Sequence, residues 1–297
     1  MDAVITYVNC DDPIWRQSYK ENVCDCSFDV TKYRDWGTLK YIFRGIDKFM
    51  PFVDRIILIV SGDSQVPDFV NKETVKVVKH EDFIPHEYLP TFNANTIENF
   101  MPYIDGLSEK FLFFNDDFFV VKPCTEEDFF TDGKPNIFFT KKINQAEGFW
   151  SMCANTMNVA NFAAFGAKSR FKETLVPQHT VAPFLRSKCL ECFKNAEKII
   201  RCTITKTREK INVTQYLFSD YLLFTNYYCN KQISFKMLRY GIMSMDEIVD
   251  GIEHPVSKTI CFNEPNAPIE NDGYVDDKEK ITSAFERLLP KKCRYEK

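Results

Sequence analysis

Residues 111–121 read FLFFNDDFFVV, and this stretch decides how the first half of the chain is organised. The apolar run at 111–114 predicts a buried strand, and a second apolar run follows at 118–121. Asp116 and Asp117 therefore stand between two hydrophobic segments. Two adjacent carboxylates repel each other, and burial penalises the charge of each. A divalent cation or a cationic ligand would relieve both costs, so the pair predicts metal or nucleotide binding.

The same residues allow a second interpretation. The tripeptide Asn-Asp-Asp at 115–117 is also good turn chemistry between the two strands of a β-hairpin. The local sequence leaves both interpretations open, and the rest of the chain has to separate them.

Other strands and helices are predicted around this stretch. Apolar, β-branched runs predict strands at residues 3–8, 55–60 and 75–79, and helical periodicity predicts helices at 35–50 and 94–103. Strands that alternate with helices indicate the α/β class. Polar loops follow three strands, at Asp11 and Asp12, at 61–63 and at 115–117. Because ligands of open α/β sheets bind beyond the carboxyl ends of the strands, we expect these loops to share one crevice.

Beyond about residue 145 the pattern changes. Helical periodicity dominates at 155–165, 180–194, 214–228 and 278–288, with one short strand at 259–262. We therefore predict an α/β half at residues 1–145 and a mainly helical half at 146–297. The two halves are expected to form one compact unit with the site between them.

The composition excludes several classes of protein. The 38 Lys and Arg residues against 42 Asp and Glu give a net charge of −4, which argues against a sequence-independent nucleic-acid binder. The longest apolar runs are strand-sized and far too short for a transmembrane segment. The chain opens without an export signal, so its 11 cysteines are expected to be reduced thiols. These features predict a cytoplasmic protein. The basic stretch 291–294 would weakly suit contact with the inner face of the membrane, although a solvated tail explains it better.

Three further residues are candidates for chemistry. His179 precedes a helical run, where it could be a general base, a ligand or a plain residue of the helix start. Arg208 lies in a basic stretch that a solvated surface would also explain, and Glu98 is unremarkable by itself. With 10 glycines and no glycine-rich phosphate loop, the sequence would have to hold phosphate with side chains and metal.

Several stretches taken together resemble the Stealth family of sugar-phosphate transferases. In chain order they are VITYVNCDDPIW at 4–15, YRDWGTLKY at 33–41, RIILIV at 55–60, HED at 80–82, LPTFNANTIE at 89–98, GLSEKF at 106–111, FNDDFF at 114–119, PQH at 177–179 with Arg208, and ICFNE at 260–264. The blocks extend over nearly the whole chain, and their common order makes the resemblance specific. Two positions depart from the family pattern: Asn9 replaces an Asp and Thr38 replaces a Glu, which weakens any catalytic role for either residue.

The resemblance implies both a fold and an activity. The fold would be a glycosyltransferase-A-like nucleotide-sugar half joined to the helical half. The activity would be transfer of a hexose 1-phosphate, with an N-acetylhexosamine favoured, from a UDP-sugar to a hydroxyl of a glycan or lipid-linked glycan. UMP would be released, and the product would belong to a capsule or another cell-surface polysaccharide.

The resemblance also assigns roles to residues. Asp116 and Asp117 would hold Mg²⁺ or Mn²⁺, and Arg208 would neutralise charge on the phosphates. His179 would act as the general base, and Glu98 would orient the acceptor, a metal-bound water or the nucleotide sugar. The catalytic candidates are thus Glu98, Asp117, His179 and Arg208, and the substrate-binding candidates are Asn9, Asp12, Arg34, Asn93 and Asn95.

Three rival functions stay open. A nucleotide-sugar glycosyltransferase would use the same fold and metal but release UDP, and the His179 and Arg208 pair argues against it. A non-catalytic carbohydrate-binding relative would be expected to have lost one of the four catalytic candidates, and all four are present. A metal-dependent phosphodiesterase would need more histidine and carboxylate ligands at recognisable spacing.

Overall fold

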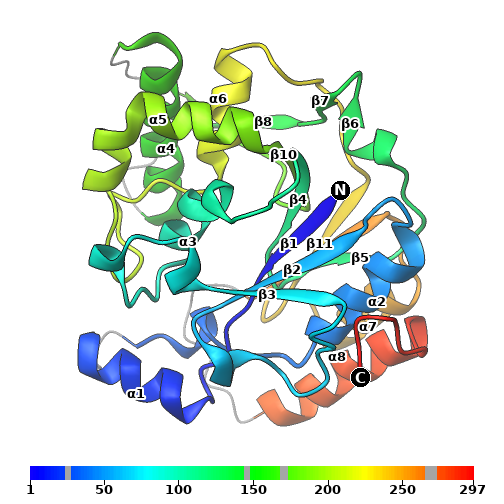
Figure 1. The fold of residues 1–297 in the computed structure, drawn as a ribbon. Coiled ribbons are helices and arrows are strands. Elements are labelled where there is room, and N and C mark those ends of the chain that lie inside the picture. The colour runs from blue at the N-terminus through cyan, green and yellow to red at the C-terminus, as the bar shows by residue number, and fades with distance from the viewer. Residues whose placement is uncertain (24–27, 144–147, 168–172, 265–272) are drawn as a thin grey trace.

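A five-stranded sheet forms the centre of the molecule (Figure 1). The computed structural model describes residues 1–297 except 24–27, 144–147, 168–172 and 265–272. The strand order is β10-β4-β1-β2-β3, with the bounds Ala182–Leu185 for β10, Lys110–Phe114 for β4, Asp2–Thr6 for β1, Arg55–Val60 for β2 and Val75–Lys79 for β3. Strands β4, β1, β2 and β3 run parallel, and β10 pairs antiparallel with β4 at one edge. The four strands predicted in the first half and the α/β class are confirmed.

Helices cover both faces of this sheet, because successive side chains of each strand point to opposite faces. Leu112 and Phe114 join one core, and Phe111 and Phe113 join the other. The first core is closed by α2 (Leu39–Phe49), α7 (Met245–Glu253) and α8 (Tyr274–Leu288). The second is closed by α3 (Ala94–Phe100), α4 (Gly148–Phe165), α5 (Arg186–Cys202) and α6 (Tyr216–Phe224). Figure 1 shows the two groups on opposite sides of the sheet.

A second sheet begins directly after the Asp116–Asp117 pair. It has the order β11-β12-β5, with the bounds Phe235–Arg239, Thr259–Asn263 and Phe118–Val120. Since β4 and β5 belong to different sheets, the hairpin interpretation of residues 115–117 is wrong, and the turn links two sheets instead. Gly45 of α2 permits this arrangement, because a Cβ at this position would lie 2.4 Å from the carbonyl oxygen of Val120. The strand predicted at 259–262 is confirmed.

One predicted helix begins too early. Residues 182–185 form the edge strand β10, and α5 starts only at Arg186. Pro183 accounts for the difference, because proline lacks the N–H that a helix interior needs and is tolerated on an edge strand. The patterns at 155–165 and 278–288 lie within α4 and α8, whereas the one at 214–228 shortens to α6.

The later half of the chain also supplies strands. Besides β10, β11 and β12, it contributes β9 (Glu173–Pro177), which pairs with β8 (Phe139–Ile143). The division at residue 145 therefore stays a prediction, since elements from both sides of it share sheets. The remaining elements, α1 (Pro13–Asn22), β6 (Phe130–Thr131) and β7 (Lys134–Pro135), lie in the connections.

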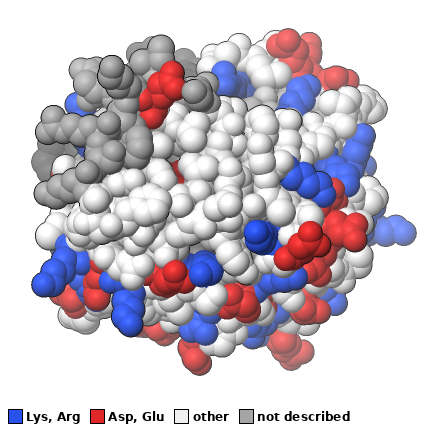
Figure 2. Space-filling view, turned by 90° about the horizontal axis from the view of Figure 1, so that it is seen from above, with Lys and Arg blue, Asp and Glu red and all other residues white. Residues whose placement is uncertain are grey.

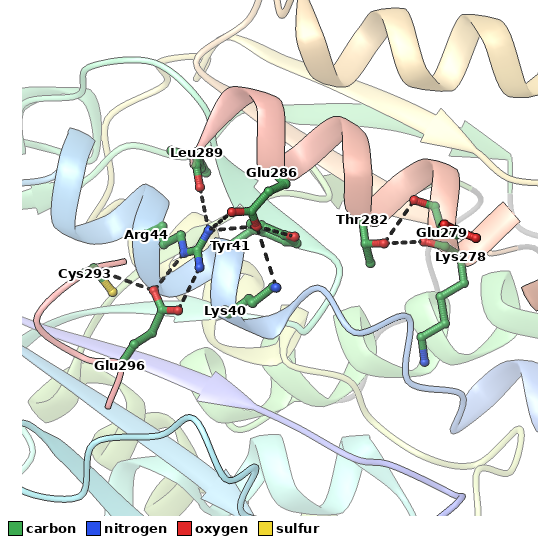
Figure 3. A network of polar contacts seen from close by, with 10 residues as sticks. All are labelled: Lys40, Tyr41, Arg44, Lys278, Glu279, Thr282, Glu286, Leu289, Cys293 and Glu296. Carbon is green, nitrogen blue, oxygen red and sulfur yellow. Dashed lines mark hydrogen bonds and ion pairs between the residues drawn. The ribbon is translucent and has the colours of Figure 1, made fainter. Parts of the chain in front are cut away.

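A polar cluster fastens the C-terminal residues to α2 (Figure 3). Arg44 donates to both carboxylate oxygens of Glu296, at 2.8 and 3.0 Å, and to both of Glu286, at 2.9 and 3.1 Å. It also donates to the carbonyl of Leu289 at 2.7 Å. We call these residues the Arg44 cluster. It holds the chain end against the body of the protein, where Lys297 also donates a backbone hydrogen bond to Phe69.

The surface carries charges of both signs. Figure 2 shows, from above, a broad area without charged side chains that is bordered by interspersed Lys, Arg, Asp and Glu. Within the part of the chain that the structure describes, none of the helices combines the length and the apolar character required to cross a bilayer.

Candidate functional site

A cavity of about 940 Å³ lies at the carboxyl ends of the parallel strands. Its described lining includes Tyr7 after β1, Ser61 after β2, His80 after β3 and residues 115–117 after β4. The expectation that the loops at 61–63 and 115–117 share one crevice is thus met in part. Asp11 and Asp12, which were expected there too, are not among the described lining residues. The opposite wall comes from the later half of the chain, with His179, Arg208, Gln215 and Tyr216 among its members.

Asp116 and Asp117 line this cavity, held between the two sheets. The backbone N–H of Phe118 donates to Asn115, and that of Phe262 donates to the carbonyl of Asp117 at 2.9 Å. Burial raises the pKa of Asp116 to about 8, and the nearby charges of Asp117 and Asp35 add to the rise. Burial also raises the pKa of Asp117, against the opposing effect of His179. The Oδ1 atom of Asp117 is buried and has no hydrogen-bond partner in the part of the chain that the structure describes.

The surroundings of Asp117 fit a cation. An unpartnered buried carboxylate oxygen is costly unless a positive charge or a donor meets it. In the described residues, neither Asp116 nor Asp117 forms an ion pair with Lys or Arg. The sulfur of Cys261 donates to Oδ2 of Asp117 at 3.4 Å, and His179 completes a group whose ligand atoms lie within 4.8 Å of one another. Asp117 is therefore the better supported of the two predicted metal ligands.

His179 is fixed from several sides. Its Nδ1 atom lies 2.8 Å from the hydroxyl of Tyr216, and its ring meets Phe118 edge-on with 4.9 Å between ring centroids. The next residue, Thr180, shares a hydroxyl hydrogen bond of 2.9 Å with Thr259 of β12. Burial lowers the pKa of His179, although the carboxylate of Asp117 opposes this shift. Since Nδ1 is engaged with Tyr216, Nε2 is the ring nitrogen left to accept a proton.

Glu98 and Arg208 face the same cavity, Glu98 from α3 and Arg208 from the connection between α5 and α6. Glu98 of α3 is 5% exposed and accepts a hydrogen bond of 3.1 Å from the backbone N–H of Gln215. Burial raises the pKa of Glu98 to about 7, and the positive charge of Arg208 opposes the rise. The four predicted catalytic residues, Glu98, Asp117, His179 and Arg208, thus all line one cavity.

The predicted substrate-binding residues divide into two groups. Arg34 and Asn95 line the cavity. Arg34 forms an ion pair of 3.3 Å with Glu264 and lies over the ring of Tyr274, 4.4 Å from its centroid. Asn95 donates to the sulfur of Met152 at 3.6 Å.

The described lining of the cavity does not include Asn9, Asp12 or Asn93. These residues instead make hydrogen bonds that stabilise turns and helix ends nearby. Asn93 is 1% exposed, caps α3 and donates to the carbonyls of Thr205 and Thr207. Asp12 caps α1 and accepts from Ser64 at 2.6 Å. The backbone N–H of Asn9 donates to the side chain of Gln65 at 2.7 Å. Asn93 fixes the segment that leads to Arg208, which is a structural contribution to the site.

Sequence reasoning missed several residues of the site. Tyr216 and Cys261 contact His179 and Asp117 but lie 37 and 144 positions away from them in the chain. Tyr7 donates to Asp35 at 3.1 Å beside Asp116. A single sequence gives no local signal for such contacts, because they depend on how strands from distant blocks pair.

The sheet, its helical layers and the cavity at the strand ends define an α/β protein with its candidate site at the carboxyl ends of a mainly parallel sheet. Two solved glycosyltransferases are similar over most of this chain at low scores. The glycosyltransferase GlyE of Streptococcus pneumoniae TIGR4 has a TM-score of 0.44 with 13% identity over 97% of this chain and 62% of its own. The galactosyltransferase LgtC has a TM-score of 0.43 with 12% identity over 95% and 96%.

Sequence comparison is more specific. Residues 32–138 match the sequence model of Stealth protein CR2, conserved region 2. A capsular polysaccharide phosphotransferase WcwK of Streptococcus pneumoniae is 28% identical over 100% of this chain and 98% of its own length. The receptor polysaccharide phosphotransferase WefC of Streptococcus oralis is 39% identical over 54% of this chain and 51% of its own. Residues 32–138 are thus similar to a conserved region of Stealth proteins, and the chain as a whole is similar to capsular polysaccharide phosphotransferases.

Proposed function

We propose that the protein transfers a hexose 1-phosphate from a UDP-sugar to a hydroxyl of a glycan acceptor and releases UMP. It is an enzyme of the sugar-phosphate transferase class. The observation that carries the proposal is the pairing of His179 with Tyr216 on one side and Asp117 on the other, at the cavity that Glu98 and Arg208 also line. The similarity to the capsular polysaccharide phosphotransferase WcwK and the receptor polysaccharide phosphotransferase WefC supports a role in capsule or cell-surface polysaccharide synthesis.

His179 supplies the base in this proposal. Its Nε2 takes the proton of the acceptor hydroxyl, while Nδ1–H is donated to the hydroxyl of Tyr216. The acceptor oxygen then bonds to the phosphorus nearer the sugar, and the bond from that phosphorus to the bridging oxygen breaks. The leaving group is UMP. The lowered pKa of His179 keeps the imidazole neutral at physiological pH, as a base requires.

Arg208 and Glu98 have separate roles in this step, one toward the phosphates and one toward the acceptor. The guanidinium of Arg208 can donate to two phosphate oxygens at once, where negative charge grows during transfer. Glu98 is held by the backbone of Gln215 at the start of α6, one residue before Tyr216. We assign to Glu98 the orientation of the acceptor hydroxyl, and to Arg34 and Asn95 contacts with the nucleotide sugar.

Asp117, with Asp116 beside it, is proposed to hold Mg²⁺ or Mn²⁺. The support is the unpartnered Oδ1 atom and the absence of a Lys or Arg ion pair in the described residues. When bound, such an ion would neutralise charge on the diphosphate. The rest of the chemistry is assigned to side chains of the chain.

Resolution of the nucleotide products tests the proposal. Purified protein is incubated with Mg²⁺, a panel of UDP-sugars and acceptor oligosaccharides, and UMP and UDP are separated. UMP that appears only when acceptor is present supports the proposal and identifies the donor. UDP as the product would overturn it in favour of a glycosyltransferase, and UMP without acceptor would indicate hydrolysis. EDTA should abolish turnover and Mg²⁺ should restore it.

A further inference from the structure

We propose that Asp117, His179 and Cys261 form a binding site for a thiophilic divalent cation such as Zn²⁺, and that this ion inhibits the enzyme. The three residues offer one carboxylate oxygen, one imidazole nitrogen and one sulfur, all within 4.8 Å of one another. This set of donors differs from the oxygen ligands that Mg²⁺ takes. Thiolate and imidazole ligands select Zn²⁺, Co²⁺ and Cd²⁺ over Mg²⁺.

The three ligands are held in place by one residue, Phe118. Asp117 directly precedes it, Cys261 is its antiparallel partner across β5 and β12, and the ring of His179 packs on its ring. Cys261 is 0% exposed in the middle of β12 and has no freedom to turn away. Cys261 lies within a paired strand, whereas Asp117 directly precedes β5 and His179 follows β9. A ligand on a paired strand is more rigid than one on a loop, so Cys261 is the most fixed of the three donors.

The distances are close to those a metal would impose. A tetrahedral ion with zinc bond lengths separates its ligand atoms by roughly 3.5 Å. Sulfur of Cys261 and Oδ2 of Asp117 are already 3.4 Å apart. Among the described residues, the buried Oδ1 of Asp117 has no hydrogen-bond partner, which is a second and independent observation that points to a cation here.

The surroundings also meet the other needs of a zinc site. Metal-binding histidines usually make a hydrogen bond with the second ring nitrogen, and Tyr216 provides that bond to Nδ1 at 2.8 Å. Asp117 and His179 line the cavity, so an ion can enter from it. Binding replaces the proton on the sulfur of Cys261, and one proton leaves for each ion bound. A fourth ligand would be water or substrate.

Inhibition follows from the residues that the ion would occupy. It would take Asp117 from Mg²⁺ and the free nitrogen of His179 from the acceptor hydroxyl. This second half of the proposal rests on the proposed function, whereas the binding site itself does not. The two can therefore be tested apart.

Co²⁺ is the probe for the site, because cobalt bound to a thiolate gives a sulfur-to-metal charge-transfer band in the near ultraviolet. We expect wild type to show this band at one equivalent of Co²⁺, and we expect Zn²⁺ to remove it. Cys261→Ala should lose the band, and Cys261→Ser should bind Co²⁺ at least ~10-fold more weakly. Cys202→Ser is the matched control, since Cys202 is exposed at the end of α5, and it should keep the band. Circular dichroism and melting curves show that each variant is folded.

The outcomes separate the two claims. A band that persists in Cys261→Ala, or one that disappears in Cys202→Ser, would overturn the site. In the transfer assay, the Zn²⁺ concentration that inhibits wild type should be at least ~10-fold lower than the one that inhibits Cys261→Ala. Added Mg²⁺ should raise the inhibitory Zn²⁺ concentration for wild type. Binding of Co²⁺ without inhibition by Zn²⁺ would leave the site standing and overturn the roles proposed for His179 and Asp117.

Discussion

The Arg44 cluster and the Asp116–Asp117 pair are both groups of charges in the interior, and they are built in opposite ways. Arg44 meets two carboxylates and a carbonyl through five hydrogen bonds (Figure 3). Asp116 and Asp117 face each other's charge, and one oxygen of Asp117 has no partner. The pKa shifts follow this difference. Burial alone would raise the pKa of Glu296, but the hydrogen bonds from Arg44 lower it. Burial and the neighbouring negative charges both raise the pKa of Asp116.

We infer from this contrast that the Arg44 cluster serves folding, and we propose that the Asp116–Asp117 pair serves function. Charges that are paired and hydrogen-bonded in the interior can be kept at little net cost. Charges left unpaired lower the stability of the fold, and such groups cluster where a ligand completes them. The following predictions test this division in order of expected size.

Breaking the Arg44 cluster should have the largest effect on stability. Arg44→Ala leaves Glu296 buried without its cation, which costs about 3–5 kcal/mol of the free energy of unfolding. Urea unfolding measures this loss, and turnover at a temperature where the variant is folded should stay within about twofold of wild type. The double variant Arg44→Met with Glu296→Gln is the control, and it should recover much of the loss because no buried charge is left unpaired. Glu286, the second partner of Arg44, is 45% exposed and keeps Lys40 at 3.7 Å. A loss below ~1 kcal/mol for Arg44→Ala would contradict the assignment.

Glu98 should make stability depend on pH. Its pKa is about 7 in the folded protein against 4.5 for the free side chain, so the folded state holds the proton more tightly. The contribution of Glu98 to stability is therefore lost as the pH rises from 4.5 to 7, by about 3 kcal/mol in total. Glu98→Gln removes this dependence, and its stability relative to wild type should be higher at pH 8 than at pH 5. Equal differences at both pH values, measured by urea unfolding, would show that Glu98 titrates normally.

The smallest effect is expected at the contact that orients His179. Tyr216→Phe removes the hydroxyl that meets Nδ1, and kcat should fall about 10-fold while KM changes by less than ~3-fold. Tyr221→Phe is the matched control on the same helix, because its hydroxyl donates to Glu191 at 2.6 Å, and it should keep full kcat. Nitrogen-15 spectra of the imidazoles report the tautomer, with four histidines to assign. An unchanged kcat and tautomer in Tyr216→Phe would remove Tyr216 from the site.

The sequence predicted most of the central sheet and missed elements that depend on distant partners. Strands such as 55–60 and 111–114 are continuous apolar runs because both of their faces are buried, and this pattern is visible locally. The edge strand β10 cannot be recognised from its local sequence, since the residues around Pro183 also fit a helical spacing. Only their pairing with β4 makes them a strand. The local sequence also does not show that residues 115–117 link two sheets, because a turn within a hairpin favours the same residue types.

The site was predicted at the level of its charged residues, and less well around them. Glu98, Asp117, His179 and Arg208 meet at one cavity, which the resemblance to the Stealth family implied. Asn93 and Asp12 are among the predicted substrate contacts, and their contact with substrate stays a prediction. In the structure both cap helices, as Asn and Asp commonly do at this position. Tyr216 and Cys261 could not be found from one sequence, because nothing in their own segments marks them.

The central claim is that the unpaired carboxylates serve transfer at the expense of stability, and Asp117→Asn tests it most directly. The amide keeps the shape of the side chain and removes the buried charge. Turnover to UMP and the free energy of unfolding at pH 7 are measured on the same preparation. The account predicts that turnover falls at least ~1000-fold while the free energy of unfolding stays equal or rises. A variant that loses stability by ~2 kcal/mol or more and keeps turnover near wild type would contradict it.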